Sequence, residues 1–231
     1  AHQDDEVFLL PYIMNSEQKL FIYLTNGVSE GVSKRKLHRR TSEAEDLFQK
    51  YLVGFNAQAI WWGFENCISE GILHKFVSKE NLTDIELRIR SRSEKVTQII
   101  TTTFEGAHQD HDSAAVISRN LANVFLVDTV EVSTYPQWFS KFYSFRVLRP
   151  TNPLKIFKFS RLKTLMLAIR LIVGYKSQRA TWLGLGPAVI ATFAFRQYRS
   201  SIPKPVELIH PCFYEFRARA FQAEVLKYLT S

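Results

Sequence analysis

The sequence predicts an α/β fold in which a mostly parallel sheet is flanked by helices. Over roughly the first 135 residues, apolar β-branched runs alternate with segments whose apolar residues recur at helical spacing. Turn signals such as Asn-Gly separate the two kinds of segment. The chain has 231 residues, of which 46% are hydrophobic and 23% charged, as in an ordinary globular protein. We therefore expect a single domain over residues 1–231.

The elements follow one another in this pattern. Residues 19–27 are apolar and end in an Asn-Gly turn signal, which predicts a buried strand. Residues 33–54 carry apolar side chains at helical spacing, and Gly54 closes this expected helix. The elements expected next are a strand, a helix capped by an Asn or a Thr, a short strand, a helix opened by Asp112 or Ser113, and a strand, over residues 57–63, 81–100, 100–106, 112–125 and 125–135.

The pattern changes in the last part of the chain. Residues 136–153 are aromatic and basic, as in a loop, and helices are expected around residues 161–175 and 187–198. The longest apolar stretch, residues 181–195, contains two glycines and a proline and is too short to span a bilayer. It is expected to be a buried helix or strand.

Composition limits the function classes. Cys67 and Cys212 stand far apart, so neither a disulfide scaffold nor a thiolate zinc site is expected. The net charge is +8, and many basic residues lie between Lys141 and Arg179. They form either a solvated face or a surface for an anionic partner: a phosphorylated substrate, an acidic polysaccharide precursor or a membrane surface. No nucleic-acid motif occurs, so no nucleic-acid partner is expected. No signal peptide is visible, and we expect a cytoplasmic protein.

Two histidine-carboxylate clusters are the candidate site. One is His2-Gln3-Asp4-Asp5-Glu6, and the other is His108-Gln109-Asp110-His111-Asp112 after a predicted strand. Each cluster alone is also typical of a polar loop. At the carboxyl ends of strands, together they offer two imidazoles, a carboxylate and further acids, which suits a catalytic zinc with an open position. Adjacent residues in an extended segment point in opposite directions, so Asp4 and Asp5 can have different roles.

These clusters resemble the motifs of a known family. "AHQDDE" resembles the AHPDDE opening of the PIG-L/LmbE-like zinc deacetylases, and "GAHQDHD" resembles their HPDH motif. "LTNGVSEG", Arg40 to Glu43, and "YKSQ" at residues 175–178 match weaker positions of the family. Gln3 and Gln109 replace the motif prolines, and the family's first strand, which precedes AHPDDE, is missing here. The resemblance implies a Rossmann-like layered fold on an N-terminally trimmed chain.

The resemblance also implies roles for individual residues. It assigns zinc ligands, catalytic residues and a substrate contact, namely His2, Asp5 and His111 for the metal, Asp4, His108 and Asp110 for catalysis, and Arg40 for the substrate. In this scheme Asp4 is the general base, and His108, partnered by Asp110, assists the oxyanion or the leaving amine. Another divalent ion can replace zinc. Arg40 can equally be a charge on a solvated helix face.

The expected function is therefore that of a zinc-dependent amidohydrolase. It removes the acetyl group from an N-acetylated amino sugar, an N-acetylglucosamine-type conjugate that can be anionic, and peripheral contact with a membrane is compatible with the charge. The alternatives are hydrolysis of another N-acyl amide and a non-catalytic relative that binds a glycan. Glu6 is expected at a helix N-terminus, Trp61 and Trp62 in sheet packing, and Trp138 is the best candidate for stacking on a sugar.

Overall fold

The computed structural model describes residues 1–104, 108–134, 148 and 153–201. These residues form both helices and short strands, which confirms the α/β class. The strands are β1 (Lys19–Ile22), β2 (Ala57–Ile60), β3 (Gln98–Thr102), β4 (Asp128–Val132), β5 (Pro153–Phe157) and β6 (Tyr198–Ser201). The α-helices are α1 (Glu6–Ile13), α2 (Lys34–Tyr51), α3 (Trp62–Glu65), α4 (Lys79–Arg90), α5 (Gln109–Phe125), α6 (Arg161–Gly174) and α7 (Arg179–Phe195). Short 3₁₀ helices are η1 (Val53–Phe55), η2 (Leu73–Phe76) and η4 (Lys176–Gln178).

The described strands form two sheets. In one sheet β1 pairs in parallel with β2. The other has the order β3-β4-β6-β5, in which β3 and β4 are parallel and β6 is antiparallel to both of its neighbours. The second sheet is therefore mixed, whereas a mostly parallel sheet was expected. β5 and β6 are joined by two consecutive helices, α6 and α7, that pack on each other. Each helix reverses the chain, so β6 returns antiparallel to β5.

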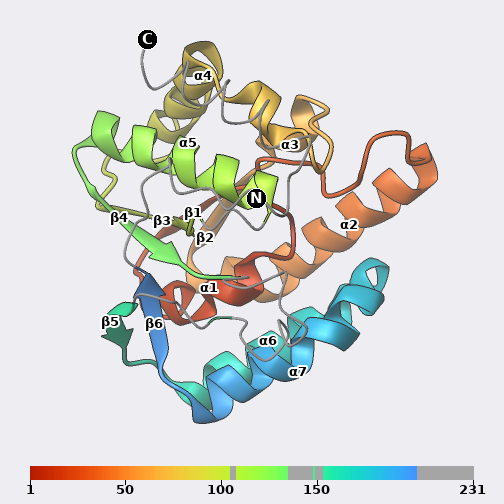
Figure 1. The fold of residues 1–231 in the computed structure, drawn as a ribbon, viewed down its shortest axis with the longest axis vertical. Coiled ribbons are helices and arrows are strands. Elements are labelled where there is room, and N and C mark those ends of the chain that lie inside the picture. The colour runs from red at the N-terminus through yellow and green to blue at the C-terminus, as the bar shows by residue number, and fades with distance from the viewer. Residues whose placement is uncertain (105–107, 135–147, 149–152, 202–231) are drawn as a thin grey trace.

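Helices cover both faces of the strands (Figure 1). α4 and α5 lie on one side, and α1, α2, α6 and α7 lie on the other. Each side has its own hydrophobic core. Phe8, Leu171 and Val189 are buried in the core between α1, α6 and α7. Ile85 and Ala115 are buried in the core of α4 and α5. The two helical layers thus leave the first turns of α1 and α5 to meet near the strand ends.

Some element boundaries differ from the expected ones. The helix expected over residues 81–100 is α4, which stops at Arg90, and Ile99 belongs to β3. After Arg90 the chain is polar and offers no apolar face to bury, which ends the helix. The cap is neither an Asn nor a Thr: the side chain of Ser78 accepts a hydrogen bond from the backbone N of Asn81 at 3.2 Å.

Three other expected elements are also shifted. α5 begins three residues before the expected opening at Asp112, with His108 as its N-cap. α7 begins at Arg179 and runs through Pro187. A proline removes the hydrogen bond to the carbonyl four residues before it, here that of the exposed Leu183, which water can reach. The strand expected over residues 57–63 ends at Ile60, and Trp62 opens α3.

The two neighbouring tryptophans serve packing, as expected. Trp62 is buried, and Trp61 stacks on Tyr23 with 4.4 Å between the ring centroids. Trp138, Cys212 and the basic residues Lys141, Arg146 and Arg149 lie outside the described residues. Cys67 is exposed and has a free thiol. Among the described helices, none has both the length and the apolar character needed to cross a membrane.

Candidate metal centre

The two histidine-carboxylate clusters meet because each occupies the start of a helix. His2 to Asp5 form a turn that leads into α1, and Glu6 is the first residue of that helix, as expected. His108 caps α5: its Nδ1 accepts a hydrogen bond from the backbone N of Asp110 at 3.3 Å. The N-terminus of the chain lies beside the start of α5 in Figure 1. Acidic side chains in both first turns are favoured by the helix dipoles.

Two histidine nitrogens and the carboxylate of Asp5 come together at the centre of this arrangement. The Nδ1 of His2 lies 3.3 Å from the Nε2 of His111. The carboxylate of Asp5 approaches both rings, with Oδ1 3.2 Å from the Nε2 of His111 and Oδ2 3.4 Å from the Nδ1 of His2. All three side chains are buried. Two imidazoles and a carboxylate are a donor set that fits a divalent cation.

The outer nitrogen of each central histidine has its own partner. The Nε2 of His2 lies 3.0 Å from the Oδ2 of Asp110, and the Nδ1 of His111 lies 3.0 Å from the Oγ1 of Thr134. Asp110 is itself held by the backbone amides of Gly71 at 2.6 Å and Leu73 at 3.2 Å. Such outer partners fix the ring orientation and leave the inner nitrogen free for a metal.

His108 completes a group of three histidines. One ring nitrogen from each of His2, His108 and His111 lies within 4.8 Å of the others, and these residues could hold a metal ion. The side chain of His108 is 27% exposed, more than the other two, so it faces the open side of the centre. Its Nε2 lies 3.8 Å from the Oε1 of Glu70. The expected partner Asp110 directs its carboxylate at His2 and two backbone amides, and Glu70 is the carboxylate beside His108.

Asp4, next to Asp5 in the chain, contacts Arg40. The Nη2 of Arg40 donates to the Oδ1 of Asp4 at 2.7 Å, and Arg40 is only 2% exposed. The Arg40 guanidinium also lies 5.1 Å from the ring centroid of Tyr175 and donates to the Oγ of Ser177 at 3.4 Å. Arg40 is therefore not a charge on a solvated face. Its contacts orient Asp4, and its burial does not favour the expected direct contact with a substrate.

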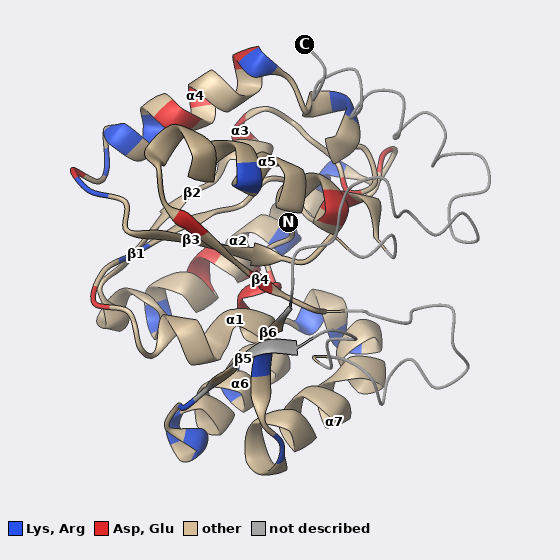
Figure 2. Ribbon diagram, turned by 60° about the vertical axis from the view of Figure 1, so that its left-hand side comes forward, with Lys and Arg blue, Asp and Glu red and all other residues tan. Residues whose placement is uncertain are grey.

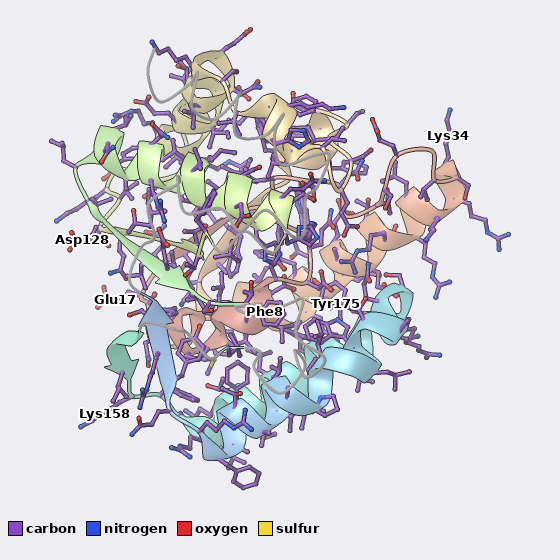
Figure 3. The ribbon with its side chains drawn as sticks, viewed as in Figure 1. Phe8, Glu17, Lys34, Asp128, Lys158 and Tyr175 are labelled. Atoms are coloured by element: carbon purple, nitrogen blue, oxygen red, sulfur yellow. The ribbon has the colours of Figure 1, made fainter. Side chains whose placement is uncertain are left out.

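Glu43, Tyr175 and Ser177 converge around this pair. Glu43, one turn after Arg40, accepts a hydrogen bond from the backbone N of Ser177 at 2.9 Å and another from its Oγ. The Tyr175 hydroxyl donates to Glu6 and to the backbone carbonyl of Gln3. Figure 3 shows Tyr175 in the interior of the molecule. The α6–α7 connection thus supports the Asp4 side of the centre.

The two glutamines that replace the motif prolines anchor the clusters to neighbouring loops. The Nε2 of Gln3 donates to the carbonyl of Thr25 at 3.0 Å, and the Nε2 of Gln109 donates to the carbonyl of Gly71. Gly27, with φ +68°, allows this approach, because a Cβ there would lie 1.7 Å from the Oε1 of Gln3. Both glutamines therefore tie the two histidine-carboxylate clusters to neighbouring loops.

Burial and neighbouring charges shift the proton affinities in the centre. Burial lowers the pKa of His111 to about 4, despite the nearby Asp5, so its ring is neutral at pH 7. Burial also opposes the charge on His2, but Asp5 and Asp110 raise its pKa well above the ordinary value. Burial similarly opposes the charges of the two carboxylates, yet neighbouring histidines keep the pKa of both Asp5 and Asp110 low. The centre therefore combines two ionised carboxylates with a charged His2 and a neutral His111, and the N-terminal ammonium lies 2.9 Å from the Oδ2 of Asp5.

Glu6 differs from the other acids of the cluster. Burial raises its pKa to about 8, and the hydrogen bond from Tyr175 only partly offsets this. Glu6 is thus a largely protonated hydrogen-bonding group near pH 7 as well as a first-turn residue.

The structure brings together all seven residues that the sequence singled out, in an inner group around His2, Asp5, His108, Asp110 and His111 and an adjoining pair, Asp4 with Arg40. Sequence reasoning missed Glu70 and Thr134. Glu70 is a lone acid in a loop and Thr134 follows a strand, and neither position has a sequence signal. No protein family, curated protein or solved structure matches this chain.

Proposed function

We propose that this protein is a zinc-dependent hydrolase that removes the acetyl group from an N-acetylated amino sugar. The spacing of the His2 and His111 ring nitrogens and the Asp5 carboxylate carries the proposal. Zinc bonds of about 2.0–2.2 Å at tetrahedral angles separate the ligand atoms by about 3.3–3.5 Å. The Nδ1 of His2 and the Nε2 of His111 are 3.3 Å apart, and each lies 3.2–3.4 Å from a different oxygen of the Asp5 carboxylate. These distances support His2, Asp5 and His111 as the zinc ligands.

Three protein ligands leave a tetrahedral ion one open position, which is typical of catalytic zinc. An ion held by His2, Asp5 and His111 would supply water of lowered pKa and would polarise an amide carbonyl. A hydrolytic site is favoured over a structural one, because His108 and Asp4 adjoin the ligands and are less deeply buried than His111 and Asp110. Another divalent ion with the same donor preference fits these residues as well.

Asp4 is the proposed general base. Arg40 holds one carboxylate oxygen, Oδ1, at 2.7 Å, and the side chain retains 12% exposure. The second oxygen is then oriented to accept a proton from the attacking water as the carbon–oxygen bond forms. Arg40 acts as a positioning residue in this scheme, with Tyr175 and the pair formed by Glu43 and Ser177 supporting it.

His108 is the proposed partner of the developing oxyanion and of the leaving amine. A protonated imidazole on the open side of the centre stabilises negative charge on the amide oxygen, and it can give its proton to the nitrogen when the carbon–nitrogen bond breaks. The Oε1 of Glu70 lies 3.8 Å from the Nε2 of His108. Acetate and a free amino sugar are the products.

The substrate class and the Rossmann-like assignment rest on the resemblance to the PIG-L/LmbE-like deacetylases. One structural feature supports it: Arg40, Glu43 and Ser177, which come from the weaker positions of the family pattern, contact one another although Ser177 is far away in sequence. A chance match of short motifs gives no reason for these side chains to meet.

Acetate release tests the proposal. Purified protein is incubated with N-acetylhexosaminides, including nucleotide-linked and lipid-linked forms, before and after treatment with a chelator and after zinc is restored. We expect release from at least one amino sugar, loss with the chelator and recovery with zinc. Acetate or acyl release only from other N-acyl amides would show that the substrate is not an amino sugar. Glycan binding without any release in the zinc-replete protein would make it a non-catalytic relative and end the proposal.

A further inference from the structure

The outward face of α6 carries a stripe of exposed apolar side chains, which we call the α6 stripe: Leu162, Met166, Ile169 and Val173. Their exposed fractions are 69%, 46%, 41% and 68%. The spacings of four, three and four residues place all four on one side of the helix, one per turn. Single exposed apolar residues are ordinary, but a continuous row of them marks an interaction surface.

The fold itself does not need this stripe. The opposite side of α6 supplies the residues that pack on α1, α2 and α7, with Leu167, Ala168 and Leu171 buried in the core. A surface helix normally has polar residues on the side away from its core. α6 is apolar on both sides, and packing within the chain accounts only for the inner side.

Basic residues border the stripe, and acids are absent from this part of the chain. Lys163 and Arg170 lie along one border and Arg161 along the other, and all three are exposed. No Asp or Glu occurs between Glu131 and Glu207. Figure 2 shows blue but no red along α6 and α7, whereas both colours occur on α2 and α4. Lys158, just before α6, lies at the edge of the molecule in Figure 3.

We propose that the α6 stripe and its basic borders bind the surface of an anionic phospholipid bilayer, with α6 lying in the plane of the interface. Interfacial helices insert an apolar face at the boundary between head groups and acyl chains and contact lipid phosphates with flanking Lys and Arg. α6 has both features, and it is held in place by its buried side. The helix does not cross the bilayer.

Charge favours this occupant over the alternatives. In a symmetric dimer the stripe would meet its own copy, which would bring Lys163, Arg170 and Arg161 close to the same residues of the second chain and cost free energy through repulsion. Nucleic acid binds through its phosphates to basic and polar groups, and the exposed apolar row between the borders has no role in such a contact. A bilayer satisfies the apolar row and the positive borders together.

Vesicle co-sedimentation tests this inference with the full chain. The probes are vesicles of phosphatidylcholine alone and vesicles with roughly one-third phosphatidylserine, at low and physiological salt. Wild-type protein should bind the anionic vesicles, bind neutral vesicles more weakly, and lose affinity as salt rises. The double variant Leu162→Ser/Val173→Ser should lose at least about tenfold in affinity, because each side chain contributes through apolar burial. Lys163→Glu/Arg170→Glu should lose about fivefold or more per residue.

Matched controls use exposed residues on other helices. Leu87→Ser/Val124→Ser on α4 and α5 removes two exposed apolar side chains, and Lys34→Glu/Lys36→Glu on α2 makes the same charge change. Both controls should bind vesicles within about twofold of wild type. All variants should keep the wild-type unfolding temperature, since the substituted side chains are exposed.

Several results would overturn the inference. One is binding by the Leu162→Ser/Val173→Ser variant equal to that of wild type, which would leave only non-specific charge attraction. Another is a wild-type dimer in light scattering that this variant converts to a monomer without any vesicle binding, which would make the face a self-interface. A third is the absence of wild-type binding to anionic vesicles at low salt, which would contradict the inference directly. Vesicle binding does not require catalysis, so these outcomes are independent of acetate release.

Discussion

The metal centre and the outer face of α6 depart in opposite ways from the usual distribution of polar and apolar side chains. The centre buries the acids Asp5 and Asp110, whereas α6 exposes Leu162 and Val173 to solvent. A buried charge without a complete set of partners raises the free energy of the folded state, and so does an apolar row in water. We therefore propose a complement outside the chain for each region: a cation for the first and a lipid surface for the second.

Within the centre, one buried charge already has its complement inside the chain. Arg40 neutralises Asp4 through a direct contact at 2.7 Å. The carboxylate of Asp5, by contrast, shares its space with two histidine rings, one of which stays neutral because burial lowers its pKa to about 4. The Asp4 pair is complete as it stands, whereas the carboxylate of Asp5 lies against His2, His111 and the N-terminal ammonium at 2.9 Å.

The largest effects are expected when this group is broken. Asp5→Ala or His111→Ala should reduce bound metal from about one ion per chain to almost none, because two ligands do not hold zinc at ordinary concentrations. The rate of acetate release should fall with it. Metal content and kcat are measured together, with the exposed Asp128→Ala as control. Stoichiometric metal in both variants would remove these residues from the ligand set.

The next largest effect separates chemistry from metal binding. Asp4→Asn keeps the size of the side chain but cannot accept the proton of water. It should retain metal, keep KM within a few-fold, and lose about 10²–10⁴ in kcat. Arg40 then keeps its buried charge without a partner, so the free energy of unfolding should also fall by up to about 3–5 kcal/mol. A metal-replete, folded variant with nearly wild-type kcat would contradict the general-base role.

His108→Ala tests the more exposed histidine. As an oxyanion partner, His108 should contribute about 10²–10³ to kcat, and the variant should keep its metal. The geometry also permits His108 as a metal-holding residue, since it belongs to the group of three histidines. Metal loss comparable to that of His111→Ala would therefore assign His108 to the ligands. A full metal content with reduced kcat would support the catalytic role.

Asp110→Asn distinguishes the two partners considered for this carboxylate. Its contact with the Nε2 of His2 predicts that the variant loses about 10–100-fold in metal affinity, because an outer partner orients the ligand. The pairing with His108 that the sequence suggested predicts unchanged affinity and lower kcat. Metal titrations of Asp110→Asn and Glu70→Gln, with kcat measured for both, distinguish the two pairings. Glu70→Gln should affect kcat more than metal affinity.

The smallest effects are expected on the outer face of α6. Leu171→Ala should lower the free energy of unfolding by about 2–5 kcal/mol, since Leu171 is buried in the core. Met166→Ser, on the same helix but in the α6 stripe, should change it by no more than about 0.5 kcal/mol. Chemical denaturation measures both. A loss for Met166→Ser as large as that for Leu171→Ala would show that the stripe serves folding.

Much of the local structure can be predicted from the sequence because its causes are local. Alternating apolar runs predicted β1, β2, β3 and β4, and helical spacing predicted α2, whose buried side chains are Arg40, Thr41, Ala44, Leu47 and Phe48. The predicted ends of α5 and α7 were less accurate, because capping and a proline compete there with helical spacing. The His108 cap moved the start of α5, and exposed backbone near Leu183 let α7 include Pro187.

The sequence by itself also determined which residues form the candidate site, since only the two clusters combine histidines with neighbouring acids. The sequence could not determine which of these side chains contact one another. Asp110 stands two residues from His108 and was paired with it, yet the start of α5 directs its carboxylate at His2, 108 residues away in sequence. Arg40 reaches Asp4, and Glu70 reaches His108, only because loops and helices from separate parts of the chain pack together. Periodicity and capping act over a few residues, whereas the direction of a side chain and its partner depend on where whole helices lie, and that was decided by the tertiary structure.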